Sequence, residues 1–157
     1  MIIIDSQTLN ELSQKAKESK RKRMNLNYHS GDSDLLQRML NAMEPSTYVR
    51  PHKHENPDKS EIFIVLKGSF AIIVFDDYGK IVNHSYLDRD KGIYAIEIPP
   101  GKWHMIISLE EDSVYYEVKN GPYDVLNDKK FAEWAPEEGS DGAITYLEGI
   151  RNSFGQL

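Results

Sequence analysis

Short β-rich segments separated by turn signals fill the middle of this 157-residue chain. Glycine, proline and acidic residues recur between the segments, at a spacing of about 8–12 residues that is typical of antiparallel sandwiches and barrels. Parallel sheets would instead require a long crossover connection after each strand. The pattern predicts an all-β core, with strands at 46–52, 61–66, 69–76, 80–88, 93–98, 104–109 and 113–119.

The segments before this core have helical character. Thr8 opens the capping-box pattern Thr-Leu-Asn-Glu, which predicts a helix over 9–20. Apolar residues from Leu35 to Met43 recur at helical spacing, and they predict a second helix that Pro45 ends. Residues 25–31 between these helices are irregular or form a short strand. We expect both helices to pack on the outside of the sheet.

These features divide the chain into three parts of one structural domain. Residues 1–45 are predicted to be a helical segment packed on the barrel, residues 46–121 the barrel itself, and residues 122–157 a C-terminal arm with one short helix and loops. A chain of this length buries one core but not two. The arm is rich in aromatic residues, so we expect it to wrap the barrel or a second subunit, which favours a homodimer.

Composition excludes several classes of function. The formal net charge of −6 argues against nucleic-acid binding, because a phosphate backbone is held by clustered lysine and arginine. No stretch has the apolar length of a membrane span or of a signal-peptide core, so we expect a cytoplasmic protein. The chain has no cysteine, which excludes disulfides, thiolate ligands and a cysteine nucleophile.

A His-x-His pair at the end of the first predicted strand indicates a metal site. In an extended chain His52 and His54 point to the same face, so their imidazoles converge without long-range folding. Glu61 opens the next apolar run, and a neighbouring strand can bring its carboxylate alongside the imidazoles. Glu55, which directly follows His54, is the alternative carboxylate.

A further histidine follows a rigid turn later in the chain. In Ile-Pro-Pro-Gly-Lys-Trp-His, the prolines and Gly101 fix the direction of the chain before His104. His104 begins a new apolar stretch, so a turn places it at the start of a strand. From this position it can face the first two histidines across a barrel.

These residues resemble the two sequence motifs of the cupin superfamily. His52, His54, Glu61 and Gly68 match the first motif, although Ser46 replaces its leading glycine and six residues separate His54 from Glu61. Pro99, Gly101 and His104 match the second motif, with Ser108 in place of its asparagine. The resemblance implies a cupin jelly-roll β-barrel with N-terminal helices and a C-terminal arm. It also implies the metal ligands, which are His52, His54, Glu61 and His104.

A closer resemblance covers residues 25–157. The segments NLNYH, LLQRMLNAM, YVRPHKH and EVKNGPYDVLNDKKFAEWAPEEG are similar to the WbuC-type cupin-fold metalloproteins. Members of that family are often encoded among bacterial surface-polysaccharide genes. The resemblance therefore implies a small-molecule ligand such as a sugar.

Three imidazoles and one carboxylate suit iron, manganese, nickel, copper or zinc, so the sequence implies a divalent transition metal without selecting one. A bound metal of this kind acts as a Lewis acid on substrate or water. Two classes of function follow. The first is a metal-dependent enzyme that isomerises, epimerises or oxygenates a small polar molecule such as a sugar nucleotide. The second is an accessory module in which the metal organises a binding pocket without turnover.

Strand parity gives candidate substrate-binding residues. Tyr48 and Arg50 share the face of the first two histidines, so we expect both to point inward. Arg50 can bind a carboxylate or a phosphate through two parallel hydrogen bonds. Tyr115 and Glu117 share one face of the last predicted strand and are candidates for acid–base work or for binding sugar hydroxyls.

Overall fold

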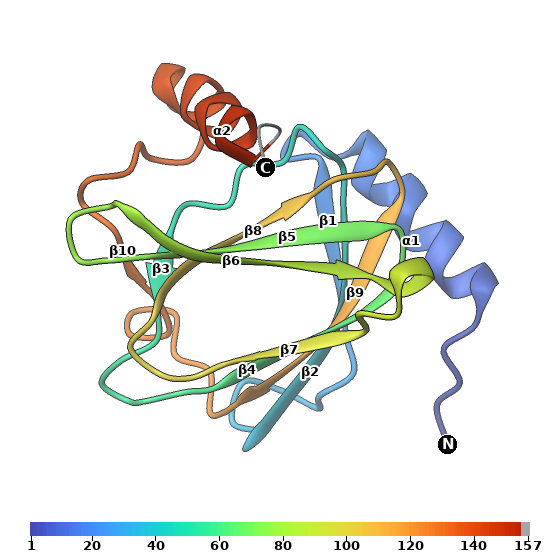
Figure 1. The fold of residues 1–157 in the computed structure, drawn as a ribbon. Helices are drawn as coiled ribbons and strands as arrows, with labels where there is room; N and C mark the ends of the chain where they lie inside the picture. The colour runs from blue at the N-terminus through green and yellow to red at the C-terminus, as the bar shows by residue number, and fades with distance from the viewer. Residues whose placement is uncertain (155–157) are drawn as a thin grey trace.

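Two antiparallel sheets of five strands face each other in the computed structural model, which describes residues 1–154 (Figure 1). The first sheet has the strand order β1 (Arg23–Asn27), β2 (Leu36–Met43), β9 (Ser113–Asn120), β4 (Glu61–Lys67) and β7 (Ala95–Ile98). The second has the order β10 (Lys130–Phe131), β3 (His52–Lys53), β8 (Trp103–Ser108), β5 (Ser69–Phe75) and β6 (Ile81–Asp88). Neighbours in each sheet are mostly distant in sequence, as in a jelly roll. The predicted all-β core is confirmed.

The strands follow the turn signals of the sequence closely. Strands β4 to β9 each start and end within two residues of their predicted positions, whereas β10 was not predicted. A short 3-10 helix, η1 (Arg89–Lys91), occupies one of the predicted turns. The first predicted strand is the exception, because 46–51 pairs with no strand and only His52–Lys53 joins the second sheet as β3.

The second predicted helix is wrong, because its residues form strand β2. This strand pairs with β1 on one side and with β9 on the other. Both of its faces are covered: Leu40 packs against Leu12 outside the sheet, and Met43 packs against Phe63 between the sheets. A strand that is apolar on both faces loses its period-2 alternation and can imitate helical spacing. Residues 1–45 therefore add two strands to the barrel and are not a wholly helical segment.

The first predicted helix is confirmed as α1 (Ser6–Glu18), but it starts earlier than expected. Asp5 is the N-cap, and its Oδ1 accepts hydrogen bonds from the N–H of Thr8 at 2.9 Å and from the Thr8 hydroxyl at 2.8 Å. An aspartate caps a helix at least as well as a threonine, so the cap moves three residues upstream. Leu12 and Ala16 pack this helix onto the outer face of the first sheet.

The C-terminal arm covers the outer face of the second sheet. Its helix α2 (Asp141–Phe154) lies over that sheet in Figure 1 and buries Leu147 and Ile150 against a cluster that includes Met105 and Ile107. Residues 155–157 of the predicted arm lie outside the described residues. The division of the chain at residues 45 and 121 stays a prediction. Within residues 1–154, neither helix has the length and apolar character that a membrane crossing requires.

A substitution at Gly68, in the tight turn from β4 to β5, tests the close approach of this turn to β9. Gly68 adopts φ +67°, and a Cβ there would overlap the side chain of Ser113. Gly92 adopts φ +75° with nothing within 4 Å of an added Cβ, so it is a matched control. Chemical unfolding should show a loss of about 1–2 kcal/mol for Gly92→Ala from backbone conformation alone. Gly68→Ala should lose about 1–3 kcal/mol more through overpacking, and equal losses would contradict the close approach.

Candidate metal centre

Three histidines and one glutamate meet at one buried point between the sheets. His52 on β3 lies directly opposite His104 on β8, and Glu61 begins β4 in the other sheet. The carbonyl of His54 accepts a 2.8 Å hydrogen bond from the N–H of Gly101, so the Pro-Pro-Gly turn is docked against the His-x-His segment. The four ligand atoms lie within 4.8 Å of one another, and each of the four residues is 3% exposed or less.

Each imidazole is oriented by a backbone carbonyl behind it. The acceptors for His52, His54 and His104 are, in turn, the carbonyl oxygens of Arg50, Asp128 and Lys102. A carbonyl oxygen can only accept a hydrogen bond, so every Nδ1 carries a proton and donates it. In a neutral ring the Nε2 atom then has a lone pair, and this is the usual arrangement of a histidine that binds a metal.

The carboxylate of Glu61 faces two of these nitrogens. Its Oε1 lies 3.0 Å from Nε2 of His54, and its Oε2 lies 2.9 Å from Nε2 of His104. In neutral rings these contacts set a nitrogen lone pair against a carboxylate oxygen, so both nitrogens and Oε2 are buried without a hydrogen-bond partner. Such atoms need a cation among them, either a proton on each ring or a metal ion. The residues therefore fit a metal ion.

Electrostatics favour the metal-binding forms of His52 and Glu61. Burial, and then the positive charge of Lys129, lower the pKa of His52 well below its usual value, so this ring is neutral. Burial alone would raise the pKa of Glu61, but the contacts with His104 and His54 hold it well below its usual range. Neutral imidazoles and an ionised carboxylate are the protonation states that metal binding requires.

The structure places Glu61, and not Glu55, with the histidines. Glu55 forms ion pairs of 2.7 Å with Lys53 and with Lys130, and its side chain is 25% exposed. The donor set is then three nitrogens and one carboxylate, which suits iron, manganese, nickel, copper or zinc. The ligand field alone does not select among these metals.

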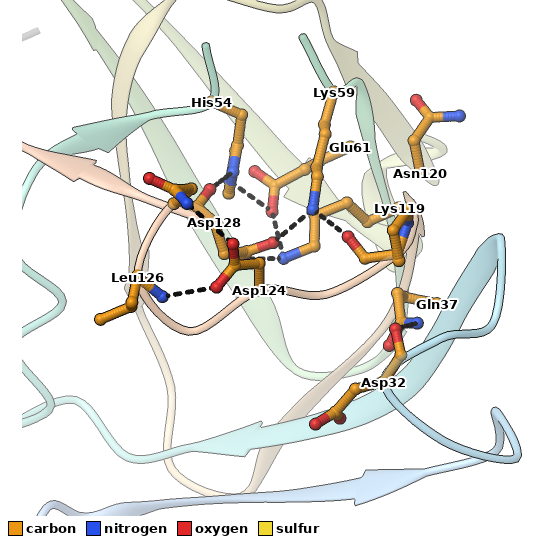
Figure 2. Close-up of polar contacts among 12 residues, drawn as sticks. Asp32, Gln37, His54, Lys59, Glu61, Lys119, Asn120, Asp124, Leu126 and Asp128 are labelled. Atoms are coloured by element: carbon orange, nitrogen blue, oxygen red, sulfur yellow. Dashed lines mark hydrogen bonds and ion pairs between the residues drawn. The ribbon is translucent and has the colours of Figure 1, made fainter. Parts of the chain in front are cut away.

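A buried network of charges supports the centre from behind (Figure 2). The carboxylate of Asp128 accepts from Lys59 at 2.8 Å and from Lys119 at 2.7 Å, and all three side chains are 4% exposed or less. Lys119 also lies 4.0 Å from Oε1 of Glu61. The carbonyl of Asp128 is the acceptor for Nδ1 of His54, so this one residue links the C-terminal arm to a metal ligand.

A cavity of about 470 Å³ opens beside the centre and has the size of a small-molecule site. Its walls include Tyr115, Glu117 and Lys119 from the inner face of β9, which lies next to β4 and Glu61. The Asn41 amide donates a 2.9 Å hydrogen bond to Glu117. Burial, and then the charge of Glu61, raise the pKa of Glu117 to about 7, so this carboxyl can hold or release a proton near neutrality.

The side chains of Arg50 and Tyr48, the other two candidate substrate-binding residues, point in different directions. Arg50 lines the cavity, where its Nε and Nη2 donate to the carbonyl of Ala132 at 3.1 and 2.8 Å. The inward direction expected of Tyr48 is wrong, because its hydroxyl donates to the Pro136 carbonyl and its ring packs in the cluster under α2. Residues 46–51 join no sheet, so strand parity does not apply to them. Substrate binding by Arg50, Tyr115 and Glu117 stays a prediction.

Apolar side chains form the inner wall next to the centre. Phe63 on the Glu61 face and Ile106 on the His104 face lie in one buried cluster with Tyr115, and the Phe63 and His104 ring centroids are 6.5 Å apart. Sequence reasoning missed the charged groups behind this wall. A weak sequence signal pointed to Lys119, because it follows Tyr115 and Glu117 on the same face of the predicted strand. Lys59 and Asp128 lie in loops, where no sequence pattern indicated that they are buried.

Comparison with a family model shows which family the chain belongs to. Residues 4–87, more than half of the sequence, match the model described as a domain of unknown function, DUF6016. The chain belongs to the DUF6016 family. The matched region contains His52, His54 and Glu61, and it ends before His104. No curated protein matches this DUF6016 chain.

Solved structures similar to this DUF6016 protein share the cupin fold. CapF of Staphylococcus aureus, a capsular polysaccharide assembling protein, is 24% identical with a TM-score of 0.58 over 69% of this chain and 29% of its own. A cupin-2 domain protein of Rhodospirillum rubrum is 17% identical with a TM-score of 0.53, over 83% of this chain and 80% of its own. L-ribose isomerase of Cellulomonas parahominis is 14% identical with a TM-score of 0.56, over 79% and 71%. These likenesses establish the fold.

Metal content tests the centre directly. Protein purified without chelator should hold about one equivalent of a divalent transition metal, and His52→Ala,His104→Ala should lose it because two of four donors are gone. His84→Ala, which removes a histidine of β6 that is two strands from His104 and outside the group of four ligands, should keep the metal. Elemental analysis beside protein concentration measures all three. Equal metal content in the double variant, or no uptake of added metal by the wild-type chain, would exclude the site.

Asp128 tests the supporting network. Asp128→Asn leaves two buried lysines without their shared carboxylate, so the free energy of unfolding should fall by about 3–5 kcal/mol. Adding Lys59→Met should recover part of the loss, because one of the unpaired charges is then removed. Urea unfolding with metal-saturated proteins measures the difference. A loss below about 1 kcal/mol for Asp128→Asn would show that the network does not stabilise the fold.

Proposed function

We propose that this protein is a metal-dependent enzyme acting on a small polar molecule, a sugar or a sugar nucleotide. The observation that carries the proposal is the set of orphaned Nε2 and carboxylate atoms at His54, Glu61 and His104, buried beside a polar cavity. A structural core gains nothing from such atoms, since hydrogen-bonded or apolar side chains would be more stable there. Their arrangement supports a site that a metal and a substrate complete.

Four residues would hold the metal, namely His52, His54, Glu61 and His104. When bound, the metal supplies Lewis acidity toward a carbonyl or hydroxyl oxygen. The chain itself supplies a proton carrier at the same end of the cavity, because the carboxyl of Glu117 is buried next to Glu61 and held by Asn41. Tyr115 closes the apolar side, packed edge-to-face against Phe63 with ring centroids 5.0 Å apart. Isomerisation, epimerisation and oxygenation all use this kind of site.

The sugar part of the proposal is supported by resemblance. Over residues 25–157 the sequence resembles the WbuC-type cupin-fold metalloproteins. Members of that family are often encoded among surface-polysaccharide genes. Two of the similar structures are named for related roles, CapF as a capsular polysaccharide assembling protein and the other as an L-ribose isomerase. The proposal therefore includes a role in surface-polysaccharide biosynthesis, while a cytoplasmic location and a homodimer stay predictions from the sequence.

Turnover tests the enzyme against the accessory module. Metal-loaded protein should convert a member of a panel of sugars and sugar nucleotides, detected by mass spectrometry and NMR. Glu117→Gln should keep its metal and lose at least about a hundredfold in rate, the range expected when a proton-transfer group is removed. His52→Ala,His104→Ala should lose both metal and rate.

The outcomes separate the two functions. If the metal-loaded protein binds a sugar nucleotide without changing it chemically, the accessory-module hypothesis is supported and the enzyme hypothesis is wrong. A rate that is equal in wild type and Glu117→Gln would remove Glu117 from the reaction and leave the metal centre in place. A full rate in the metal-free double variant would contradict metal dependence altogether.

A further inference from the structure

The side chains that line the cavity include more basic than acidic residues, although the whole chain is acidic. The chain has a formal net charge of −6, yet five lysine and arginine residues line the cavity against four acidic residues. The acids are also shared: Glu138 lies 2.6 Å from Arg23 and 3.7 Å from Arg21, and Asp128 is divided between two lysines. The side chains that line the cavity therefore carry one more positive than negative charge on an otherwise acidic protein, which favours anionic ligands.

Lys129 is the cation on this wall without a partner. Among the described residues 1–154, its ammonium takes part in no ion pair and no side-chain hydrogen bond, although it lines the cavity and is half-buried. It directly follows Asp128, whose carbonyl holds His54. Two residues after Lys129, Phe131 lies opposite His52 in the sheet, with ring centroids 6.1 Å apart. Lys129 thus lies at the end of the cavity that adjoins the metal centre.

Arg50 lines the same cavity, and its guanidinium carbon lies 5.7 Å from the ring centroid of Phe131, two residues after Lys129. Nε and one N–H of Nη2 are directed to the carbonyl of Ala132, which fixes the plane of the group. The nearest carboxylate, that of Glu137, is 3.8 Å from Nη1 on a side chain that is 82% exposed, so this pair is weak. The outer N–H groups of Nη1 and Nη2 remain for an end-on contact with two oxygens of one anion.

We infer that Lys129 and Arg50 form an anion-binding subsite beside the metal centre, and that the substrate carries a carboxylate or a phosphate group. The inference deepens the proposed function and rests on it, since it takes the cavity as the substrate site. An anionic group bound there would leave the remainder of a small molecule facing the metal ligands and Glu117. The carboxyl of Glu117 does not itself occupy the subsite, because it is hydrogen-bonded to Asn41.

Matched ligands test the subsite. Glucose, glucuronate and glucose 6-phosphate share a ring and differ in charge, so calorimetric titration into metal-loaded and metal-free protein separates a neutral sugar, a carboxylate and a phosphate. We expect at least one charged ligand to bind the wild-type chain more tightly than glucose does. Lys129→Met should weaken that binding by about tenfold or more, because a charge-assisted hydrogen bond is lost.

The adjacent lysine provides the control variant. Lys130→Met removes a charge one residue away, but that ammonium is 59% exposed and paired with Glu55 on the outside, so binding should not change. Weakening by Lys129→Met but not by Lys130→Met, with metal content unchanged in both, supports the subsite. Equal affinity in wild type and Lys129→Met, or no preference for charge, overturns it.

Metal content keeps this test separate from that of the proposed function. If the wild-type chain holds metal but does not prefer charged ligands, the subsite fails and the metal centre stands. If the chain holds no metal but binds a charged ligand through Lys129, the metal-dependent enzyme fails and the anion subsite stands. Charged-ligand binding that requires metal and is unaffected by Lys129→Met assigns the anion to the metal alone and overturns the subsite.

Discussion

Two nitrogen lone pairs held against one buried carboxylate are the constraint on which the rest of this structure depends. With water excluded, the contacts of Glu61 with His54 and His104 are stable only when a cation lies among them. The barrel nevertheless aligns these atoms through fixed backbone acceptors behind the rings. Leaving one buried charge uncompensated costs several kcal/mol in a folded protein. The fold thus keeps an arrangement that a proton on each ring or a bound metal ion must complete, which is expected of a functional site and not of packing.

The C-terminal arm is part of this arrangement rather than an addition to it. Asp128 contributes its carbonyl to the orientation of His54 and its carboxylate to Lys59 and Lys119, which would otherwise be two buried charges without a partner. Burying three charges is tolerable because each is paired and hydrogen-bonded. The arm then continues as β10, where Phe131 lies opposite His52 in the sheet. A disturbance of the arm is therefore transmitted to two of the four metal ligands.

The parts that could be predicted from sequence are those in which local pattern decides the structure. Turn residues fixed the strands after Glu61, and the i, i+2 spacing of His52 and His54 placed two ligands on one face. Prediction failed where long-range packing decides: β2 looked helical because both of its faces are covered, and Tyr48 lies in a segment that pairs with no strand. Lys129 comes from a loop that only the fold brings to the centre, so no local signal could have indicated it.

The metal centre and the cavity beside it come from different parts of the chain, and this separation bears on how function should be assigned. The four candidate ligands lie in the segments that resemble cupin motifs, and their geometry fits a metal ion. The groups that would meet a substrate lie on β2, on β9 and in the arm, as Asn41, Glu117 and Lys129 show. A shared fold at 14–24% identity carries over neither set. The identity of the substrate is therefore a question about charge and hydrogen bonding on the cavity wall. That wall includes Lys129, which has no partner within residues 1–154, and the carboxyl of Glu117, which can exchange its proton.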